Sequence, residues 1–388
     1  MILITEVSHP GDVHVEVNSS FVEIISKIYP DEQIVFRAEK GHIAAVSKFF
    51  KDPRNLSFVG FEKYYDPKAF SWRQRIVGEI KEIKRSLKAG AQSDASTCAW
   101  TCIFPTGQFF LSLYLMLFNR RKTNHLIVLH GELEFLRDKR RKKTEAFLGF
   151  LQKCAIRLSP KNVRYIVLGD SIKTHLKAYF SERVLQKVIP ILHPYHYDDN
   201  KQAILTRDCA KPVLLGTIGT QMLSKNSQHI FSLAEGMRED IVRGDFKFIT
   251  IGKVLPELLA YKNEFVTQLY ADSFVPPSIF EEEVNKLDFV LFFYDNNSYR
   301  LCPSGAIFEV IKLGKPVIST HNSYFDWLFE KYGKMGFLCR DINAMRLLIK
   351  EIKAGKRDNE INQVLETIRQ FKVYNDLNAI AVDLAAKL

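Results

Sequence analysis

Apolar residues along this chain alternate between short unbroken runs and stretches with helical spacing. The runs at 2–5, 33–37, 56–61, 96–103, 126–129 and 165–168 predict strands, and the stretches at 15–28, 42–50, 70–89 and 143–158 predict helices between them. Strands that alternate with helices are typical of a parallel sheet with helical crossovers. The first half of the chain is therefore predicted to be α/β.

The same alternation restarts after a polar stretch that ends at Lys211. Strands are predicted at 212–216, 246–251, 265–269, 289–293 and 316–318, with helices up to 237, at 255–262, 279–286, around 306–311 and from 342, and one or two helices at 360–388. An Ile-Pro-rich segment at 188–194 precedes the polar stretch. We therefore expect a first domain at 1–195, a linker at 196–211, a second Rossmann-like domain at 212–365 and a helical tail at 366–388.

Residues 288–320 have the clearest βαβ pattern. The predicted helix follows Ser304-Gly305, which lies at the carboxyl end of the preceding strand, where parallel sheets bind their ligands. Free N–H groups, a hydroxyl and the positive end of the helix dipole can bind a phosphate there. Glu309, about 6 Å further along the helix, is better placed for a ribose diol. Alternatively, Ser304 is only a helix cap and Glu309 a solvated side chain.

Charge is unevenly distributed along the 388 residues, whose formal net charge is +11. Residues 1–195 contain 31 Lys and Arg against 19 Asp and Glu, so their net charge is +12, and the remainder carries −1. Basic clusters at 81–88, 120–122 and 137–143 could meet anionic lipid, an anionic glycan or nucleic acid, or could simply be a solvated face. No nucleic-acid-binding motif accompanies them, so nucleic acid is not an expected partner.

The remaining bulk features indicate a cytoplasmic protein. The apolar run at 1–4 is too short for a signal peptide, and the six cysteines lack the paired spacing of a zinc ribbon, which indicates free thiols. The apolar stretch at 104–118 has fifteen residues, fewer than the roughly 20 that cross a bilayer. It is predicted to be a buried helix, or one that docks peripherally on the inner face of the membrane.

The segment at 304–319, SGAIFEVIKLGKPVIS, with Tyr299 and Arg300 before it, resembles the donor-nucleotide segment of GT-B glycosyltransferases. The resemblance is to bacterial capsular and exopolysaccharide enzymes of the family 4 and family 1 type. It implies a GT-B fold, in which two Rossmann-like domains face each other across a cleft and a C-terminal helix crosses back to the first. Retaining relatives carry a second Glu eight residues before the ribose-binding one, where this chain has Leu301.

The resemblance also implies the residues of a nucleotide-sugar site. Gly219 and Lys225 match the glycine and lysine of the family's phosphate loop, although Thr220 stands where an Arg is usual. Lys225 could instead be a solvated loop residue. Arg300 could supply the missing guanidinium, because Arg binds phosphate with a fork of donors. The expected donor site is made by Gly219, Lys225, Tyr299, Arg300, Ser304, Gly305, Ala306 and Glu309.

A catalytic base is expected from the first domain. Asp12 follows Gly11 just after the first strand, and His130 and Glu132 end the 126–129 strand. Asp12 is the first choice and His130 the second, with His14 a weaker candidate, although such residues are often only turn or cap residues. Neither an Asp-x-Asp nor an H-E-x-x-H motif is present, so no metal site is expected.

The predicted function is transfer of a sugar from a UDP- or GDP-sugar to a glycan or polyprenyl-linked acceptor in bacterial surface polysaccharide synthesis. No cofactor is expected, and the GT-B resemblance implies metal independence. Two alternatives stay open. One is a GT-B sugar-nucleotide epimerase, and the other is a non-catalytic partner subunit, which the residues at Leu301 and Thr220 would permit.

Overall fold

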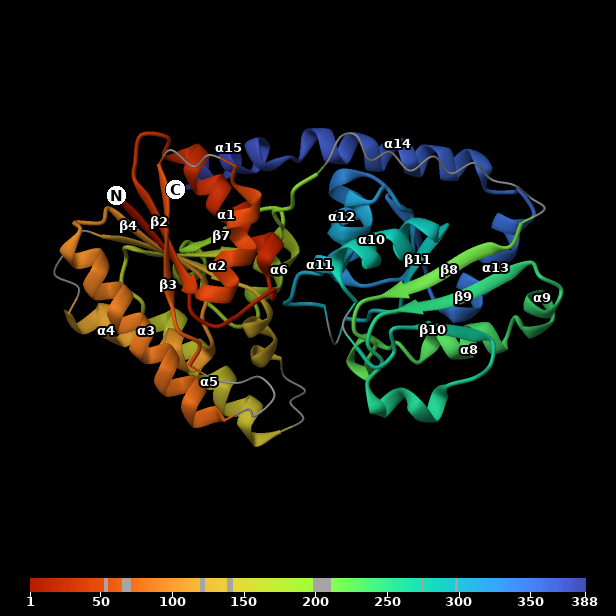
Figure 1. The fold of residues 1–388 in the computed structure, drawn as a ribbon, viewed down its shortest axis with the longest axis horizontal. Coiled ribbons are helices and arrows are strands. Elements are labelled where there is room, and N and C mark those ends of the chain that lie inside the picture. Colours follow the sequence, from red (N-terminus) through yellow and green to blue (C-terminus); the bar gives the residue numbers. More distant parts are fainter. Residues whose placement is uncertain are drawn as a thin grey trace. The chain divides into compact units, whose positions relative to one another are not determined.

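The computed structural model describes residues 1–51, 55–64, 71–118, 123–137, 142–197, 211–273, 275–296 and 299–388 (Figure 1). The chain forms two compact units. The first unit contains Met1–His196, Leu301–Pro303 and Asn375–Leu388, and the second contains Tyr197–Arg300 and Ser304–Tyr374. The predicted basic cluster at 120–122 and most of the cluster at 137–143 lie outside the described residues.

A parallel sheet forms the centre of the first unit, with the order β3-β2-β1-β4-β5-β6-β7 across its described strands. The chain winds from β1 out to β3 and then returns to β4 beside β1. The loops after β1 and β4 therefore flank a topological switch point, where open α/β sheets bind ligands. The strands are β1 (Ile2–Glu6), β2 (Ile34–Glu39), β3 (Leu56–Phe61), β4 (Thr97–Cys102), β5 (Asn124–Leu129), β6 (Val163–Val167) and β7 (Val188–Pro190).

Two groups of helices pack against this sheet: α1 contacts α2 and α15, and α4 contacts α3 and α5 (Figure 1). The helix α15 is the expected C-terminal return, and Lys387 Nζ donates to Pro190 O at 2.8 Å. No helix among the described residues is long and apolar enough to span a bilayer. The helices are α1 (Val15–Ile28), α2 (Lys40–Val46), α3 (Trp72–Gln92), α4 (Pro105–Phe118), α5 (Lys143–Leu158), α6 (Asp170–Leu176), α7 (Glu182–Leu185) and α15 (Leu377–Lys387), with 3-10 turns η1 (Ser47–Phe49) and η2 (Gly131–Leu136).

The second unit repeats the arrangement with the strand order β10-β9-β8-β11-β12-β13. Its switch point lies between β8 and β11, which pair in parallel. The strands are β8 (Val213–Ile218), β9 (Phe246–Ile251), β10 (Val266–Leu269), β11 (Phe289–Phe292), β12 (Val317–Thr320) and β13 (Gly336–Cys339). The helices are α8 (His229–Glu235), α9 (Arg238–Val242), α10 (Pro277–Lys286), α11 (Gly305–Lys312), α12 (Ser323–Tyr332), α13 (Ile342–Lys353) and α14 (Asp358–Tyr374), with 3-10 turns η3 (Leu223–Lys225) and η4 (Pro256–Tyr261).

Three of the differences between the structure and the predicted elements have a local explanation. The helix predicted at 255–262 is wrong, because Pro256 starts only the 3-10 turn η4. The helix predicted at 42–50 starts earlier, since the Glu39 side chain accepts from Gly41 N and His42 N and caps α2. The helix α12 was not predicted, although Asn322 caps it by accepting from Phe325 N at 3.0 Å.

Candidate functional site

The loops after β8 and β11 meet at the switch point of the second unit. The Asn226 side chain donates to Phe293 O at 3.1 Å and so ties the end of one loop to the start of the other. Asn226 adopts a left-handed backbone conformation with φ of 54°, which asparagine tolerates better than most residues. Because carboxyl ends of parallel strands share one edge, both loops border the same surface of this unit.

Gly219 begins the first of these loops and has a φ of 73°, which favours glycine. Its N–H donates to Ile251 O at 2.9 Å, and Gly252 packs against its backbone so closely that a Cβ there would lie 2.4 Å from Gly219 O. Lys225, at the end of the same loop in η3, is half-buried. The structure therefore places the two predicted phosphate-loop residues on one loop with a fixed backbone.

Ser304 occupies the N-cap position of α11 but does not act as a cap, since its side chain makes no capping hydrogen bond. The residue is only 2% exposed, and its Oγ has no hydrogen-bond partner among the described residues. Gly305 and Ala306, which start the helix, are partly exposed, and Glu309 lies half-buried one turn further along. Buried hydroxyls are normally hydrogen-bonded, so this one is available to a bound ligand.

An aromatic pair shapes the second loop. The rings of Tyr294 and Tyr299 stack with centroids 3.7 Å apart and planes 14° from parallel. Thr320 Oγ1 donates to Tyr294 O at 2.7 Å, which fixes the base of this pair. Arg300 follows Tyr299 and is half-buried, whereas Leu301 is completely buried. The position where retaining relatives carry a carboxylate is thus an apolar core position in this chain.

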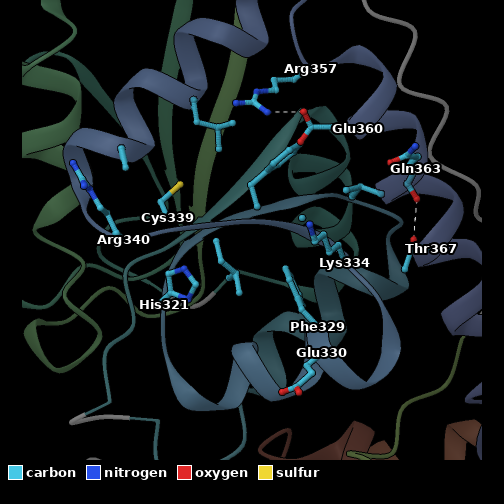
Figure 2. A pocket seen from close by; sticks show the side chains of 16 residues that line it. His321, Phe329, Glu330, Lys334, Cys339, Arg340, Arg357, Glu360, Gln363 and Thr367 are labelled. Atoms are coloured by element: carbon cyan, nitrogen blue, oxygen red, sulfur yellow. Dashed lines mark hydrogen bonds and ion pairs between the residues drawn. The ribbon is translucent and has the colours of Figure 1, made fainter.

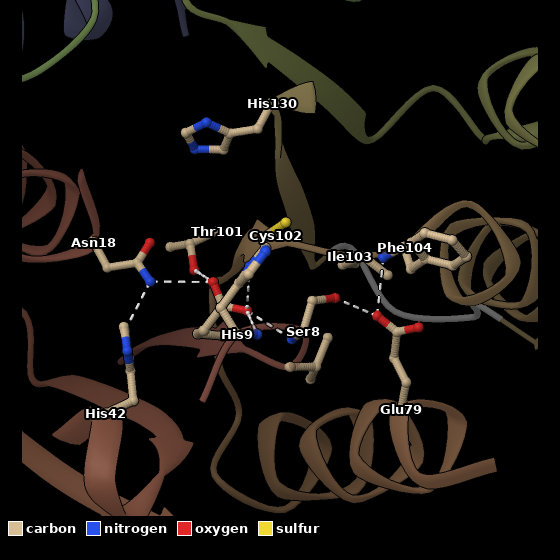
Figure 3. A network of polar contacts seen from close by, with 12 residues as sticks. Ser8, His9, Asn18, His42, Glu79, Thr101, Cys102, Ile103, Phe104 and His130 are labelled. Carbon is tan, nitrogen blue, oxygen red and sulfur yellow. Dashed lines mark hydrogen bonds and ion pairs between the residues drawn. The ribbon is translucent and has the colours of Figure 1, made fainter. Parts of the chain in front are cut away.

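At the switch point of the first unit, a buried carboxylate organises a polar network (Figure 3). Glu6, the last residue of β1, is 1% exposed and accepts hydrogen bonds from four donors. These are Ser8 N at 2.6 Å, His9 N at 3.0 Å, Asn18 Nδ2 at 3.1 Å and Thr101 Oγ1 at 3.0 Å. Burial raises the pKa of Glu6, but the His9 side chain, the charge of His42 and the hydrogen bond from Ser8 N outweigh it and lower the pKa to about 2. Glu6 is therefore ionised.

Histidine rings form a row beside this carboxylate. The ring centroids of His9 and His14 are 4.2 Å apart, those of His14 and His130 are 4.9 Å apart, and those of His130 and His193 are 6.3 Å apart. Burial lowers the pKa of His14 to about 3 and that of His193 to about 4, and burial with neighbouring imidazoles lowers the pKa of His130 well below its usual value. These three rings are neutral at pH 7. For His9, burial lowers the pKa but Glu6 outweighs it and raises the pKa.

The three predicted bases differ in exposure and in hydrogen-bond partners. Asp12 is exposed on the turn after β1. His130 is 5% exposed, and Glu132 accepts from His130 N at 2.8 Å and from Cys102 Sγ at 2.7 Å, so both carboxylate oxygens have donors. Burial raises the pKa of Glu132 despite these donors.

Several residues of this cluster were missed by sequence reasoning, namely Glu6, His9, Glu79, Cys102 and His193. Glu79, on α3, accepts from Ser8 Oγ and from Phe104 N, and burial raises its pKa to about 7 against those hydrogen bonds. The sequence signal that could have found them was their position relative to the strands. Glu6 and Cys102 end buried strands, and His9 lies in the loop that follows one. The contacts themselves join residues up to 95 positions apart and leave no local motif.

A separate cavity of about 910 Å³ lies beside the edge strand β13 in the second unit (Figure 2). Its lining includes His321, Cys339, Arg340, Arg357 and Thr367, and none of the predicted site residues. Arg357 is paired with Glu360 at 2.5 Å and with Glu351 at 2.7 Å, so its charge is already compensated. This cavity therefore does not contain the predicted donor site.

Comparisons with known proteins identify the fold. No protein-family profile matches the chain, and no curated protein matches its sequence. Solved structures match it along nearly its whole length. The chain is similar to WaaG, described as a glycosyltransferase involved in lipopolysaccharide biosynthesis, with a TM-score of 0.63 and 11% identity over 99% of this chain and 98% of that one.

Two further structures give the same result. HepE from Anabaena, solved in complex with UDP-glucose, has a TM-score of 0.62 and 13% identity over 99% of this chain and 98% of its own. A glycosyltransferase from Rickettsia africae has a TM-score of 0.61 and 13% identity over 98% and 96%. Sequence identity this low supports a shared fold but not a shared chemistry. With its two Rossmann-like sheets and its returning C-terminal helix, the chain has the GT-B fold of the glycosyltransferases.

Proposed function

We propose that this protein transfers a sugar from a nucleoside diphosphate donor to a glycan or lipid-linked saccharide in surface polysaccharide synthesis. The observation that carries the proposal is the Ser304 hydroxyl, which is buried, unpartnered among the described residues and placed where α11 begins. An anionic ligand at this point would supply the missing hydrogen-bond partner and meet the positive end of the helix dipole. The UDP-glucose complex of HepE supports a nucleotide sugar as that ligand.

In the proposed donor site, the predicted residues other than Gly219 divide the tasks. Ser304 Oγ and the N–H groups of Gly305 and Ala306 hold the diphosphate, and Lys225 and Arg300 neutralise its charge as the leaving group departs. Glu309 accepts from the ribose hydroxyls, and Tyr299 lines the loop beside them. This arrangement stabilises the diphosphate with side-chain cations and N–H dipoles, so the proposed transfer needs no metal at the donor.

The proposed reaction breaks the bond between the anomeric carbon and the diphosphate oxygen and forms a new one to an acceptor hydroxyl. The hydroxyl proton passes to a base, for which we propose Asp12, since it is exposed on the loop at the first unit's switch point. His130, neutral and buried, is the second candidate. Glu132 is already held by Cys102 and the His130 backbone, so we assign it a positioning role.

Nucleotide binding is the direct test. UDP or GDP is expected to raise the melting temperature of the full chain, measured by thermal shift against CMP and buffer. Ser304→Ala is expected to weaken binding about tenfold, because a hydrogen bond to a charged group contributes about 1.5–3 kcal/mol. Ser232→Ala removes an exposed hydroxyl on α8 and should bind like the wild type. A chain that no nucleotide stabilises would contradict the donor site.

We also propose that the first unit docks on an anionic membrane surface. Exposed apolar side chains lie on three helices that pack together, and basic side chains of α3 are exposed on the same group. Lys84 Nζ lies 5.4 Å from the Phe110 ring, so the basic and apolar helices are in direct contact. Apolar insertion together with lysines suits an anionic headgroup layer. The apolar residues are Trp72, Val77, Met116, Leu117, Phe118, Phe147 and Phe150, and the basic ones are Lys81, Lys84, Arg85 and Lys88.

Vesicle sedimentation tests this docking. The wild type is expected to sediment with vesicles that contain phosphatidylglycerol and to stay in solution with phosphatidylcholine alone. Leu117→Gln combined with Phe118→Gln should reduce the bound fraction several-fold, because both side chains are more than half exposed at the end of α4. Val242→Gln, at an 81% exposed position in the second unit, is the matched control. Equal sedimentation with both lipids would refute the proposal.

A further inference from the structure

The histidine row in the first unit contains a set of side chains of the kind that bind transition metals. His9 and His14 come from the loop after β1, and Cys102 is the last residue of β4, so the three converge from both sides of the switch point. One potential ligand atom from each residue lies within 4.8 Å of the other two. A tetrahedral zinc ion places such atoms roughly 3.3–3.8 Å apart, so small side-chain rotations would complete the geometry.

Unpartnered nitrogens provide a second, independent observation. Nδ1 of His14 and Nε2 of His130 are both buried, and neither has a hydrogen-bond partner among the described residues. His130 is 95% buried, so its nitrogen has little access to bulk water. Native proteins rarely leave buried polar atoms unpaired, and an ion is one of the standard explanations. The sulfur–carboxylate contact between Cys102 and Glu132 accounts for the thiol but not for these nitrogens.

The surroundings supply what a metal site requires beyond its ligands. Glu6 Oε1 lies 3.7 Å from His9 Nδ1, and Glu6 is itself fixed by Asn18 and Thr101. Carboxylates beside metal-binding histidines commonly orient the ring and raise its basicity. Glu132, in contact with Cys102 Sγ, provides an acceptor for the thiol proton. These carboxylates therefore offset the charge of a bound cation.

We propose that His9, His14 and Cys102 bind a divalent zinc-type cation in the first unit, with a fourth position open to water or to His130. Nitrogen and sulfur donors favour zinc over magnesium or calcium, which prefer oxygen. On binding, the Cys102 S–H bond breaks, the sulfur lone pair binds the ion, and the proton passes to Glu132 and then to solvent. No electron transfer is involved. The site lies within one unit, and zinc binding is measured without the proposed glycosyl transfer.

Metal analysis of the full chain tests this proposal. Protein stripped with a chelator and then dialysed against Zn²⁺ is expected to retain one zinc per chain and to melt at a higher temperature. Replacement by Co²⁺ should give the near-ultraviolet absorption of a thiolate-to-cobalt charge transfer. Both readouts are taken on the wild type, so they do not depend on whether a variant folds.

Variants then assign the ligands. Cys102→Ser should abolish the charge-transfer absorption and weaken zinc binding at least tenfold, and His9→Gln should weaken binding to a similar extent. Cys98→Ser is the matched control, since Cys98 is buried on the same strand but outside the cluster, and it should retain one zinc. Wild-type protein that retains no zinc, or a cobalt form without thiolate absorption, would overturn the proposal. Undiminished zinc binding by Cys102→Ser would do the same.

Discussion

Replacing Glu6 with glutamine is expected to destabilise the first unit by about 3 kcal/mol at neutral pH. An amide is uncharged and has only one acceptor oxygen, while the two Glu6 oxygens accept from four donors. Removing one member of a buried, charged network leaves the remaining groups unsatisfied, which costs more than a typical surface substitution. Urea unfolding of the first unit, followed by circular dichroism, measures the loss.

The pH dependence of this loss has a defined sign. Folding lowers the pKa of Glu6 from 4.5 to about 2, so its contribution is fully present above pH 4.5 and is lost as the pH falls towards 2. The difference in stability between wild type and Glu6→Gln should therefore shrink across that window.

Glu79 serves as a control in which the pKa shift has the opposite sign. Because folding raises its pKa to about 7, wild-type stability falls between pH 4.5 and 7, and Glu79→Gln should remove that fall. Parallel profiles for wild type and Glu6→Gln would contradict an ionised Glu6.

Gly252→Ala is expected to cost at least 3 kcal/mol of stability in the second unit and to abolish nucleotide binding. Gly252 has a φ of 129°, which side chains other than hydrogen rarely allow, and a Cβ there would lie 2.4 Å from Gly219 O. The clash is with backbone, so it cannot be relieved by a side-chain rotation. The loop that carries Gly219 and Lys225 must shift instead. Thermal unfolding and a nucleotide titration measure the two effects.

The matched control is Gly244→Ala. Gly244 also has a positive φ, of 87°, but a Cβ there meets nothing within 4 Å. This variant should lose only the smaller cost of backbone strain, about 1 kcal/mol, and keep its nucleotide affinity. If both variants bound nucleotide as the wild type does, the contact between Gly252 and Gly219 would not matter for the proposed donor site.

The fold could be predicted from the sequence because its signals are local. Buried parallel strands such as 289–292 are continuous apolar runs, and Gly314 after α11 marks the turn back into β12. Ser304 and Glu309 could be assigned to one βαβ unit for the same reason, since they lie only five residues apart. The prediction failed where the helical pattern was weak. Whether 255–262 forms an α-helix or a 3-10 turn depends on tertiary packing and not on spacing alone.

The polar cluster of the first unit could not be predicted in the same way. His9 and Cys102 are 93 positions apart, and only the pairing of β1 with β4 brings them together. Burial sets the protonation of His14 and His130. It arises only when the unit packs, so no local sequence pattern reports it. The sequence did place His14 and His130 after predicted strands, and the shared edge of parallel strand ends was the strongest sign that they could lie close together.

The helix α15 packs on α1, so the first unit is made of segments from both ends of the described chain. During synthesis, the ribosome must therefore deliver all of the second unit before the first can cover the apolar face of α1. Until then, the side of α1 that contacts α15 has no partner. We expect the second unit to mature earlier than the first, and chaperones that bind exposed apolar helices to hold the nascent N-terminal segment in the interval.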